Sequence, residues 1–194
     1  MLDAILVQRK VGIKVRVTAK TLVAVGLVLL AVALPQIVHL VAGASGGVTW
    51  LPMYLPVLIG GCLLGTWWGL GVGVASPIFS YIFTSMFLSP MPALERLPFM
   101  IAELAVFAVV SGLFSKKIVK NNWMAFPAVL LAQVSGRAVF IALVAIFDSL
   151  TSLSVGMVWS QIQTGMVGLV LQAIIVPFII MGLAKLIKKE QTNE

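Results

Sequence analysis

The stretch LERLPFMIAELAVFAVVSGLF, residues 94–114, poses the central problem of the fold. From Leu97 onward it has the apolar character of a membrane-spanning helix, which needs roughly 20 mainly apolar residues. Glu103 lies inside this segment, far from either polar end. A charged side chain at the centre of a spanning helix costs about 2.5–3.5 kcal/mol on insertion scales. The fold must therefore provide Glu103 with a partner or a wet cavity.

The rest of the chain has the composition of an integral membrane protein. Of its 194 residues, 61% are hydrophobic and 10% are charged, and the mean hydropathy is +1.13. With short connections, this length holds about six spanning helices and no separate soluble domain. We therefore predict an all-α bundle that forms a single transmembrane domain, residues 1–194. The basic first twenty residues lack a continuous apolar core before a small-residue cleavage site, so no signal peptide is predicted.

Hydropathy divides the chain into six predicted spans. The Gly-rich sequence ASGG, residues 44–47, ends the first span, and GTWWGLG, residues 65–71, separates the second from the third. A Pro-rich loop, LSPMPALERLP, precedes the fourth span. The predicted spans cover residues 21–43, 51–67, 70–87, 98–115, 123–148 and 158–184.

The distribution of charge predicts how this bundle is oriented. Six spans place both termini on one side, and eleven of the 13 Lys and Arg residues fall on that side. By the positive-inside rule, both termini are cytoplasmic. All five Trp residues fall at predicted membrane interfaces, where their amphipathic rings are favoured. The net charge of +7 is thereby explained by orientation and by contact with anionic lipids, and nucleic-acid binding is not predicted.

Glu103 and Arg137 are the two ionisable residues that lie clearly inside predicted spans. At 1.5 Å per residue, they differ in depth by about 9 Å, which two such side chains can bridge. Because consecutive spans tend to be neighbours, we predict that the two groups interact. Two interpretations stay open. The pair is either a buried salt bridge that fixes helix packing, or part of a solute cavity that opens to the outside.

Further polar residues lie near the outer ends of the predicted spans, where a pocket loaded from outside needs them. Amides inside spans, such as Gln133 and Gln172, are expected to form hydrogen bonds between helices. The lone histidine, His39, is of a type that more often marks a membrane boundary than a ligand. The predicted substrate-binding residues are His39, Trp50, Tyr54, Glu103, Arg137, Trp159 and Gln163.

This sequence lacks the motifs of several classes of catalytic and ATP-binding sites. There is no Gly-rich phosphate loop, no HExxH and no GxSxG. One Cys and one His cannot form a Cys/His metal centre. We find neither a chain of intramembrane carboxylates for proton coupling nor an inverted repeat. The sequence therefore predicts a binding protein without catalytic activity, metal or cofactor, which takes its energy from a partner.

Four stretches in the second to sixth spans resemble the membrane-embedded, substrate-binding S components of energy-coupling-factor vitamin transporters. The Pro-rich loop before the fourth span and the Glu within AEL are the most telling similarities. The stretches are LPMYLPVLIGGCLLGTWWGLGVGVASPIFSYIFTSM at 51–86, LPFMIAELAVFAVVSGLF at 97–114, SGRAVFIALVAIF at 135–147 and TGMVGLVLQAIIVPFII at 164–180.

This resemblance implies six helices with cytoplasmic termini in a prokaryotic plasma membrane. It implies that a vitamin binds near the outer face, and that the protein topples in the membrane while docked on a transmembrane T component driven by two ATPases. The implied lids are residues 44–53 and 88–98, and within them we single out Gly46, Gly47, Met91, Glu95 and Arg96. The first span has no clean Ala-x-x-x-Ala pattern, so its predicted docking residues are Ala24, Gly26, Ala31 and Ala33.

The predicted solute is cobalamin, with pantothenate or another small vitamin or precursor as the alternative. A Gly-rich lid and a mostly apolar wall suit a large, mostly neutral solute, whereas a small anion makes better use of Arg137. Family members tend to have His at the position of Tyr54, so the solute is expected to differ from theirs. Two other classes stay open: an assembly protein in which Glu103 and Arg137 only fix helix packing, and a self-sufficient channel or carrier.

Overall fold

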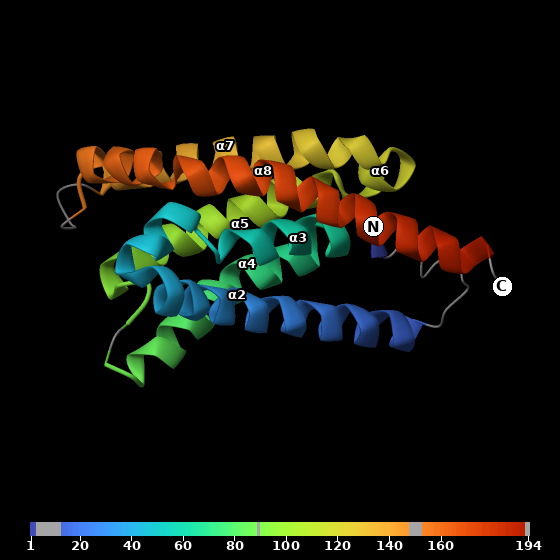
Figure 1. The fold of residues 1–194 in the computed structure, drawn as a ribbon, viewed down its shortest axis with the longest axis horizontal. Coiled ribbons are helices and arrows are strands. Elements are labelled where there is room, and N and C mark those ends of the chain that lie inside the picture. The colour runs from blue at the N-terminus through green and yellow to red at the C-terminus, as the bar shows by residue number, and fades with distance from the viewer. Residues whose placement is uncertain (3–12, 89, 148–152, 193–194) are drawn as a thin grey trace.

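The chain folds into a bundle of helices, seen in a computed structural model that describes residues 1–2, 13–88, 90–147 and 153–192 (Figure 1). All regular secondary structure in these ranges is helical. Two short 3₁₀ turns, η1 (Leu94–Arg96) and η2 (Asn122–Met124), precede α5 and α7. The helices are α2 (Ile13–Trp50), α3 (Tyr54–Leu64), α4 (Thr66–Ser85), α5 (Leu97–Leu113), α6 (Ser115–Lys120), α7 (Ala125–Ile146) and α8 (Val155–Thr192).

Five segments of the described chain are long and apolar enough to cross a membrane, so this is a multi-pass membrane protein. The predicted third span corresponds to α4, which is 20 residues long but lies outside this set. Its sequence is rich in Gly, Ser and Thr, which lower its mean hydropathy. The predicted end of the fifth span, residue 148, lies outside the described residues. The five segments are Ile13–Gly43, Ser45–Leu64, Leu94–Leu113, Asn122–Ile146 and Val155–Lys185.

Two glycines with positive φ redirect the chain. Gly43 has φ 68° and forms a non-helical kink that joins two helical parts of α2, while Gly65 has φ 84° and separates α3 from α4. Glycine adopts such angles at little cost because it has no Cβ. The predicted division within residues 65–71 is thus confirmed. The predicted end of the first span at residue 43 is confirmed, because the first spanning segment ends at the non-helical Gly43. The break lies at Gly43 itself rather than within residues 44–47, and helical structure resumes at Ser45 and runs to Trp50.

Helix α5 occupies the centre of the bundle. It packs against α3, α4 and α7, while α8 covers α7 and α2 lies against α3, α4 and α8. In Figure 1, α7 and α8 form one layer, α3 to α5 the middle layer, and α2 the opposite layer. The fully buried side chains of Leu58, Leu104, Phe107 and Val129 form the core around α5.

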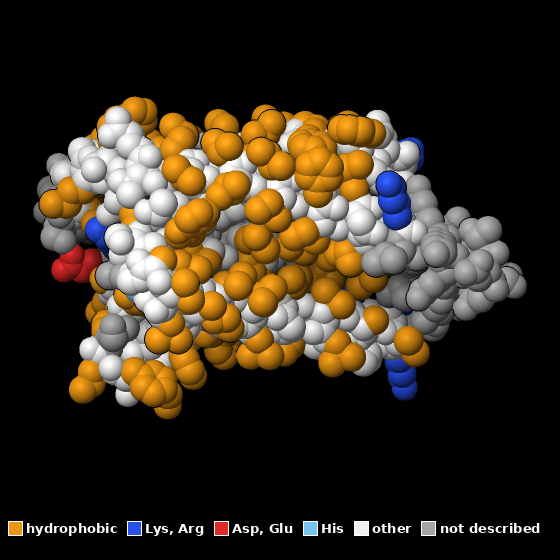
Figure 2. Space-filling model, in the orientation of Figure 1, with side chains coloured by type: hydrophobic (Ala, Val, Ile, Leu, Met, Phe, Trp, Pro, Cys, Tyr) orange, Lys and Arg blue, Asp and Glu red, His pale blue; other side chains and the backbone are white. Residues whose placement is uncertain are grey.

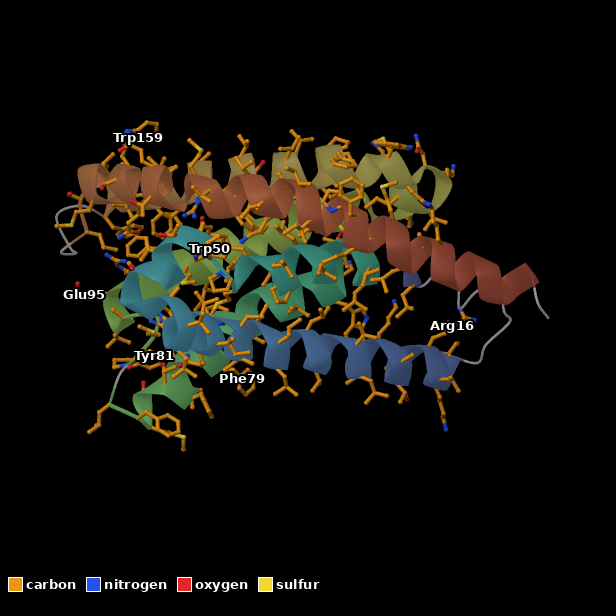
Figure 3. All side chains as sticks on the ribbon, viewed as in Figure 1. Arg16, Trp50, Phe79, Tyr81, Glu95 and Trp159 are labelled. Atoms are coloured by element: carbon orange, nitrogen blue, oxygen red, sulfur yellow. The ribbon has the colours of Figure 1, made fainter. Side chains whose placement is uncertain are left out.

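Glu103 and Arg137 lie inside the bundle, whereas the charged residues labelled in Figure 3 lie at its ends. In Figure 3, Arg16 lies at one end, and Glu95 and Trp159 lie at the other. Helix α6, with its three lysines, lies at the same end as the labelled termini in Figure 1. Hydrophobic side chains cover most of the face shown in Figure 2, between these ends. The described lysines and arginines are therefore segregated along the bundle much as the sequence predicts.

A substitution at Gly136 tests the contact between α5 and α7. A Cβ at this position would overlap the ring of Phe107 and lie 3.1 Å from the carbonyl oxygen of Glu103. We expect Gly136→Ala to lower the thermal stability of the purified protein, by about 1–3 kcal/mol, because overpacking displaces the two helices. Gly182→Ala in α8 is the control, since no atom lies within 4 Å of its new Cβ. Equal melting temperatures for the two variants would contradict this packing.

Candidate functional site

A pocket of about 360 Å³ lies at the end of the bundle that holds Glu95 and Trp159. Its wall is formed by the late part of α2, the first residue of α3, the late part of α4, residues 90–96, and the adjoining ends of α5, α7 and α8. Most lining residues are apolar, among them Met100 and Phe140. Volumes of about 300–1,000 Å³ are typical of sites for small organic ligands. The pocket is therefore of the size and composition of a small-molecule site.

Three side chains form a buried cluster in the pocket wall, which we call the buried triad: Tyr54, Glu103 and Arg137. The Tyr54 hydroxyl donates a hydrogen bond to Glu103 Oε2, at 2.8 Å. Arg137 Nη1 lies 3.0 Å from Glu103 Oε1. The guanidinium carbon of Arg137 lies 5.0 Å from the centre of the Tyr54 ring, within the range of a cation–π contact. The predicted interaction between Glu103 and Arg137 is confirmed.

Each member of the triad comes from a different helix, and local packing holds each one in place. Tyr54 is the first residue of α3, directly after the break at residues 51–53. Its ring meets Phe107 of α5 edge to face, with centroids 5.0 Å apart. Glu103 lies early in α5, and α7 carries Arg137 alongside it. The triad therefore depends on the same close packing of α3, α5 and α7 that forms the core.

The triad leaves part of its hydrogen-bonding capacity unused. Among the described residues, the buried Arg137 Nε and Nη2 have no acceptor with hydrogen-bond geometry, and Glu103 Oε1 has no donor with such geometry. Leaving a buried polar group unpaired costs about 1–3 kcal/mol, and more for a charged group. The triad is therefore incompletely paired, and part of the cost of burying its two charges is not offset.

Both predicted lids are fastened to neighbouring helices. Gln172 Nε2 of α8 donates to the carbonyl oxygens of Trp50 (3.0 Å) and Leu51 (2.9 Å). In the second lid, Met91 N donates to Thr84 Oγ1 at 2.7 Å, and Ser80 Oγ donates to Met91 O at 2.8 Å. Residues on both sides of the pocket mouth are therefore held by hydrogen bonds to α4 and α8.

A contact at the rim links the second lid to α8. With the Gln161 amide oriented toward Arg96, its oxygen accepts from Nη1 at 2.8 Å and from Nη2 at 2.6 Å. Both residues line the pocket. This orientation is assigned from the hydrogen bonds, because amide oxygen and nitrogen are otherwise hard to distinguish.

The structure brings some of the predicted site residues together and separates others. The pocket is lined by His39, Tyr54, Glu103, Arg137 and, from the predicted lids, Gly47, Met91 and Arg96. Trp50, Trp159 and Gln163 are exposed and do not line it, so the geometry does not support a binding role for them. Glu95 is also exposed outside the pocket, and Gly46 is buried against Val38 and Ala42.

Sequence reasoning missed several pocket residues. In the sequence, Gln161 is only one of several amides inside predicted spans, and nothing marks Ser80 as a pocket residue. The apolar wall residues Met100 and Phe140 cannot be told from core residues by sequence. The interhelical role expected of amides is seen at Gln133, which donates to the Leu169 carbonyl oxygen at 3.0 Å.

The four predicted docking residues do not form one surface of α2. Ala31 is fully buried, and Ala24 packs against the core. Gly26 and Ala33 are exposed. The prediction of these four residues rests on their small size alone. Small residues permit close helix contacts inside the bundle as well as on its surface, so size does not identify a docking face.

Within the described part of the chain, no group of three or more His, Cys, Asp or Glu side chains comes together to hold a metal ion. No protein-family model matches the chain, and no curated protein and no solved structure shows significant similarity to it. Its function is therefore argued from the pocket and from the sequence.

A double-mutant cycle tests the coupling within the triad. Glu103→Gln leaves Arg137 as an unpaired buried charge, and Arg137→Gln does the same to Glu103, so each is expected to cost about 3–5 kcal/mol of stability. The double variant removes both charges, and we expect it to cost clearly less than the sum of the two single variants. The measurement is the thermal unfolding of the purified protein in detergent.

Glu95→Gln is the control for the cycle, because it removes an exposed carboxylate near the start of the same helix. We expect it to change stability little. Strictly additive costs for Glu103→Gln and Arg137→Gln would show that the two charges do not stabilise each other.

Proposed function

We propose that this protein is the S component of an energy-coupling-factor vitamin transporter, which binds a small solute in the pocket and passes it inward with partner subunits. The observation that carries the proposal is the pocket itself, at one end of an apolar bundle, with the mostly buried side chain of Arg137 in its wall. The sequence resemblance, which spans residues 51–180 with gaps, supports the assignment to this class.

The proposed topology has six crossings, with α4 as the third. Successive helices then alternate in direction, so both termini lie on one side. The positive-inside rule makes this side cytoplasmic, because the lysines of α6 and the basic start of α2 lie there. The pocket then opens toward the outer face of a prokaryotic plasma membrane, where it meets its solute.

Transport against a gradient requires energy from partner subunits. The sequence holds no Gly-rich phosphate loop, so we assign ATP hydrolysis to two ATPases and coupling to a transmembrane T component. Helix α2 is the proposed docking element, through its exposed residues Gly26 and Ala33 rather than through all four small residues. The basic cytoplasmic end then contacts anionic lipids.

The size of the pocket favours the smaller of the two predicted solutes. At about 360 Å³, it lies near the lower end of the usual range for ligand sites. A corrinoid such as cobalamin needs a much larger space, and the lid carbonyls of Trp50 and Leu51 are bonded to Gln172. We therefore place a solute of the size of pantothenate first, and cobalamin second.

The other two classes predict different observations. In an assembly protein, the triad serves only for packing, a role that does not explain a pocket of about 360 Å³ beside it. A self-sufficient carrier needs no T component or ATPases. Purification from the native membranes separates these classes, because an S component is expected to carry its T component and ATPases with it.

A variant with a filled pocket tests the proposal without touching the triad. Met100 lines the pocket, and a tryptophan there is expected to occupy much of its volume. We expect one member of a vitamin panel to raise the melting temperature of the wild type, since a ligand at 100 times its Kd stabilises by about 2.7 kcal/mol. Met100→Trp is expected to abolish this shift.

Val134→Trp is the matched control, because Val134 is exposed on the outer surface of α7. We expect it to keep the solute-dependent shift. Binding of no vitamin to the wild type, or an unchanged shift in Met100→Trp, would contradict the proposed function.

A further inference from the structure

We infer that the solute carries a negatively charged group, which binds beside Arg96 at the rim of the pocket. This inference rests on the proposed function and names the chemical class of the solute. It is drawn from three features of the pocket: the two charges of the triad cancel, Arg96 has no anionic partner among the described residues, and the rest of the wall is mostly apolar.

The first feature is that the charges of the triad are paired with each other. Glu103 accepts a hydrogen bond from Tyr54 and forms an ion pair with Arg137, whose guanidinium also lies over the Tyr54 ring. Glu103 is fully buried, and the Arg137 side chain is only 11% exposed. The triad therefore adds no net charge to the pocket, and it serves as a fixed part of the wall.

The second feature is the charge of Arg96, the remaining charged residue of the described pocket wall. Arg96 is the last residue of η1, directly before α5, and is only partly exposed. No ion pair joins it to a carboxylate within the described part of the chain. Its neighbour Glu95 is exposed and does not line the pocket. The described wall therefore carries one net positive charge, and this charge lies at the rim.

A neutral amide holds the Arg96 guanidinium in place. The Gln161 oxygen accepts from Nη1 at 2.8 Å and from Nη2 at 2.6 Å, which ties η1 to α8. The amide orients the guanidinium but has no formal charge, so it does not neutralise it. A cleft lined by one sign of charge attracts ligands of the opposite sign, and a group that is already oriented loses little conformational entropy when a ligand binds. Arg96 is thus an oriented cation beside a pocket.

The third feature is the apolar remainder of the wall. The pocket of about 360 Å³ includes Met100 and Phe140. A charge placed against such side chains without a partner costs far more than an uncharged group. The solute is therefore expected to point its charged group toward Arg96 and a largely uncharged body toward the apolar wall. The imidazole of His39, which also lines the pocket, can bind a hydroxyl or amide group of that body.

The test compares anions with neutral analogues of the same skeleton. The pairs are pantothenate with panthenol, biotin with biotinamide, and pyridoxine 5′-phosphate with pyridoxine, so that carboxylates and a phosphate are both represented. Riboflavin and cyanocobalamin are further uncharged probes. Affinities for the full-length protein in detergent are measured by calorimetry. We expect one anion to bind at least about tenfold more tightly than its neutral partner, because a hydrogen bond to a charged group contributes at least this much.

Two variants remove the net charge of the rim in different ways. Arg96→Gln removes the cation, and Gln161→Glu places a carboxylate against it. We expect each variant to bring the affinity for the anion close to that for its neutral partner. If Arg96 only tied η1 to α8, its substitution would change both affinities equally.

Melting curves without solute show whether each variant is folded. Lys120→Gln is the control for loss of one positive charge, because Lys120 is exposed in α6, at the opposite end of the bundle. We expect this variant to bind the anion and its neutral partner like the wild type.

The outcomes distinguish the inference from the proposed function. If an uncharged vitamin binds most tightly, the inference is overturned and the function stands. A preference for the anion that persists in folded Arg96→Gln or folded Gln161→Glu would also overturn the inference, because the charged group would then lie elsewhere. Binding of no compound in the panel would contradict the proposed function, and the inference with it.

Discussion

The burial of Glu103 against Arg137 is the constraint on which the rest of the structure depends. In an apolar bundle, neither charge has water to solvate it, so each must be met by another polar group. Tyr54 meets one carboxylate oxygen of Glu103, and Arg137 meets the other. Three helices are therefore held in one arrangement, with α5 between α3 and α7. The cost of this arrangement is offset only in part, since two nitrogens of Arg137 have no acceptor among the described residues.

The pocket follows from the position of this cluster near one end of the bundle. The break at residues 51–53 brings Tyr54 under the end of α2, and Pro90 and Met91 cover the opposite side. Gln172 and Ser80 donate hydrogen bonds to these segments, and Thr84 accepts one from the Met91 backbone N–H.

Much of the fold was predictable because the membrane imposes simple rules on sequence. Apolar stretches of sufficient length marked most of the helices, and Gly65 marked the break between α3 and α4. The two charges inside spans could be paired from their depth alone. The Gly-rich sequence also marked the end of the first span near Gly43, but the helical structure of residues 45–50 could not be predicted, because such a sequence also suits a loop.

The pocket was less predictable than the fold. Depth along a span placed Trp50, Trp159 and Gln163 at the correct end of the bundle but did not say which side of the helix each one occupies. The hydrogen bond from Tyr54 to Glu103 joins residues 49 positions apart, and no spacing rule indicates it. Nor could sequence show that the triad lines a pocket. That position makes a packing contact part of a candidate binding site.

NMR of the arginine side chains tests most directly the claim that a solute binds in the pocket beside Arg137. The chain has four arginines, so a sample labelled with ¹⁵N-arginine gives few Nε–H signals, and Arg137→Lys assigns the buried one. The account predicts that the solute which stabilises the protein shifts the Arg137 Nε–H signal strongly and leaves Arg16 unchanged. An unshifted Arg137 signal in the solute-saturated protein would contradict it.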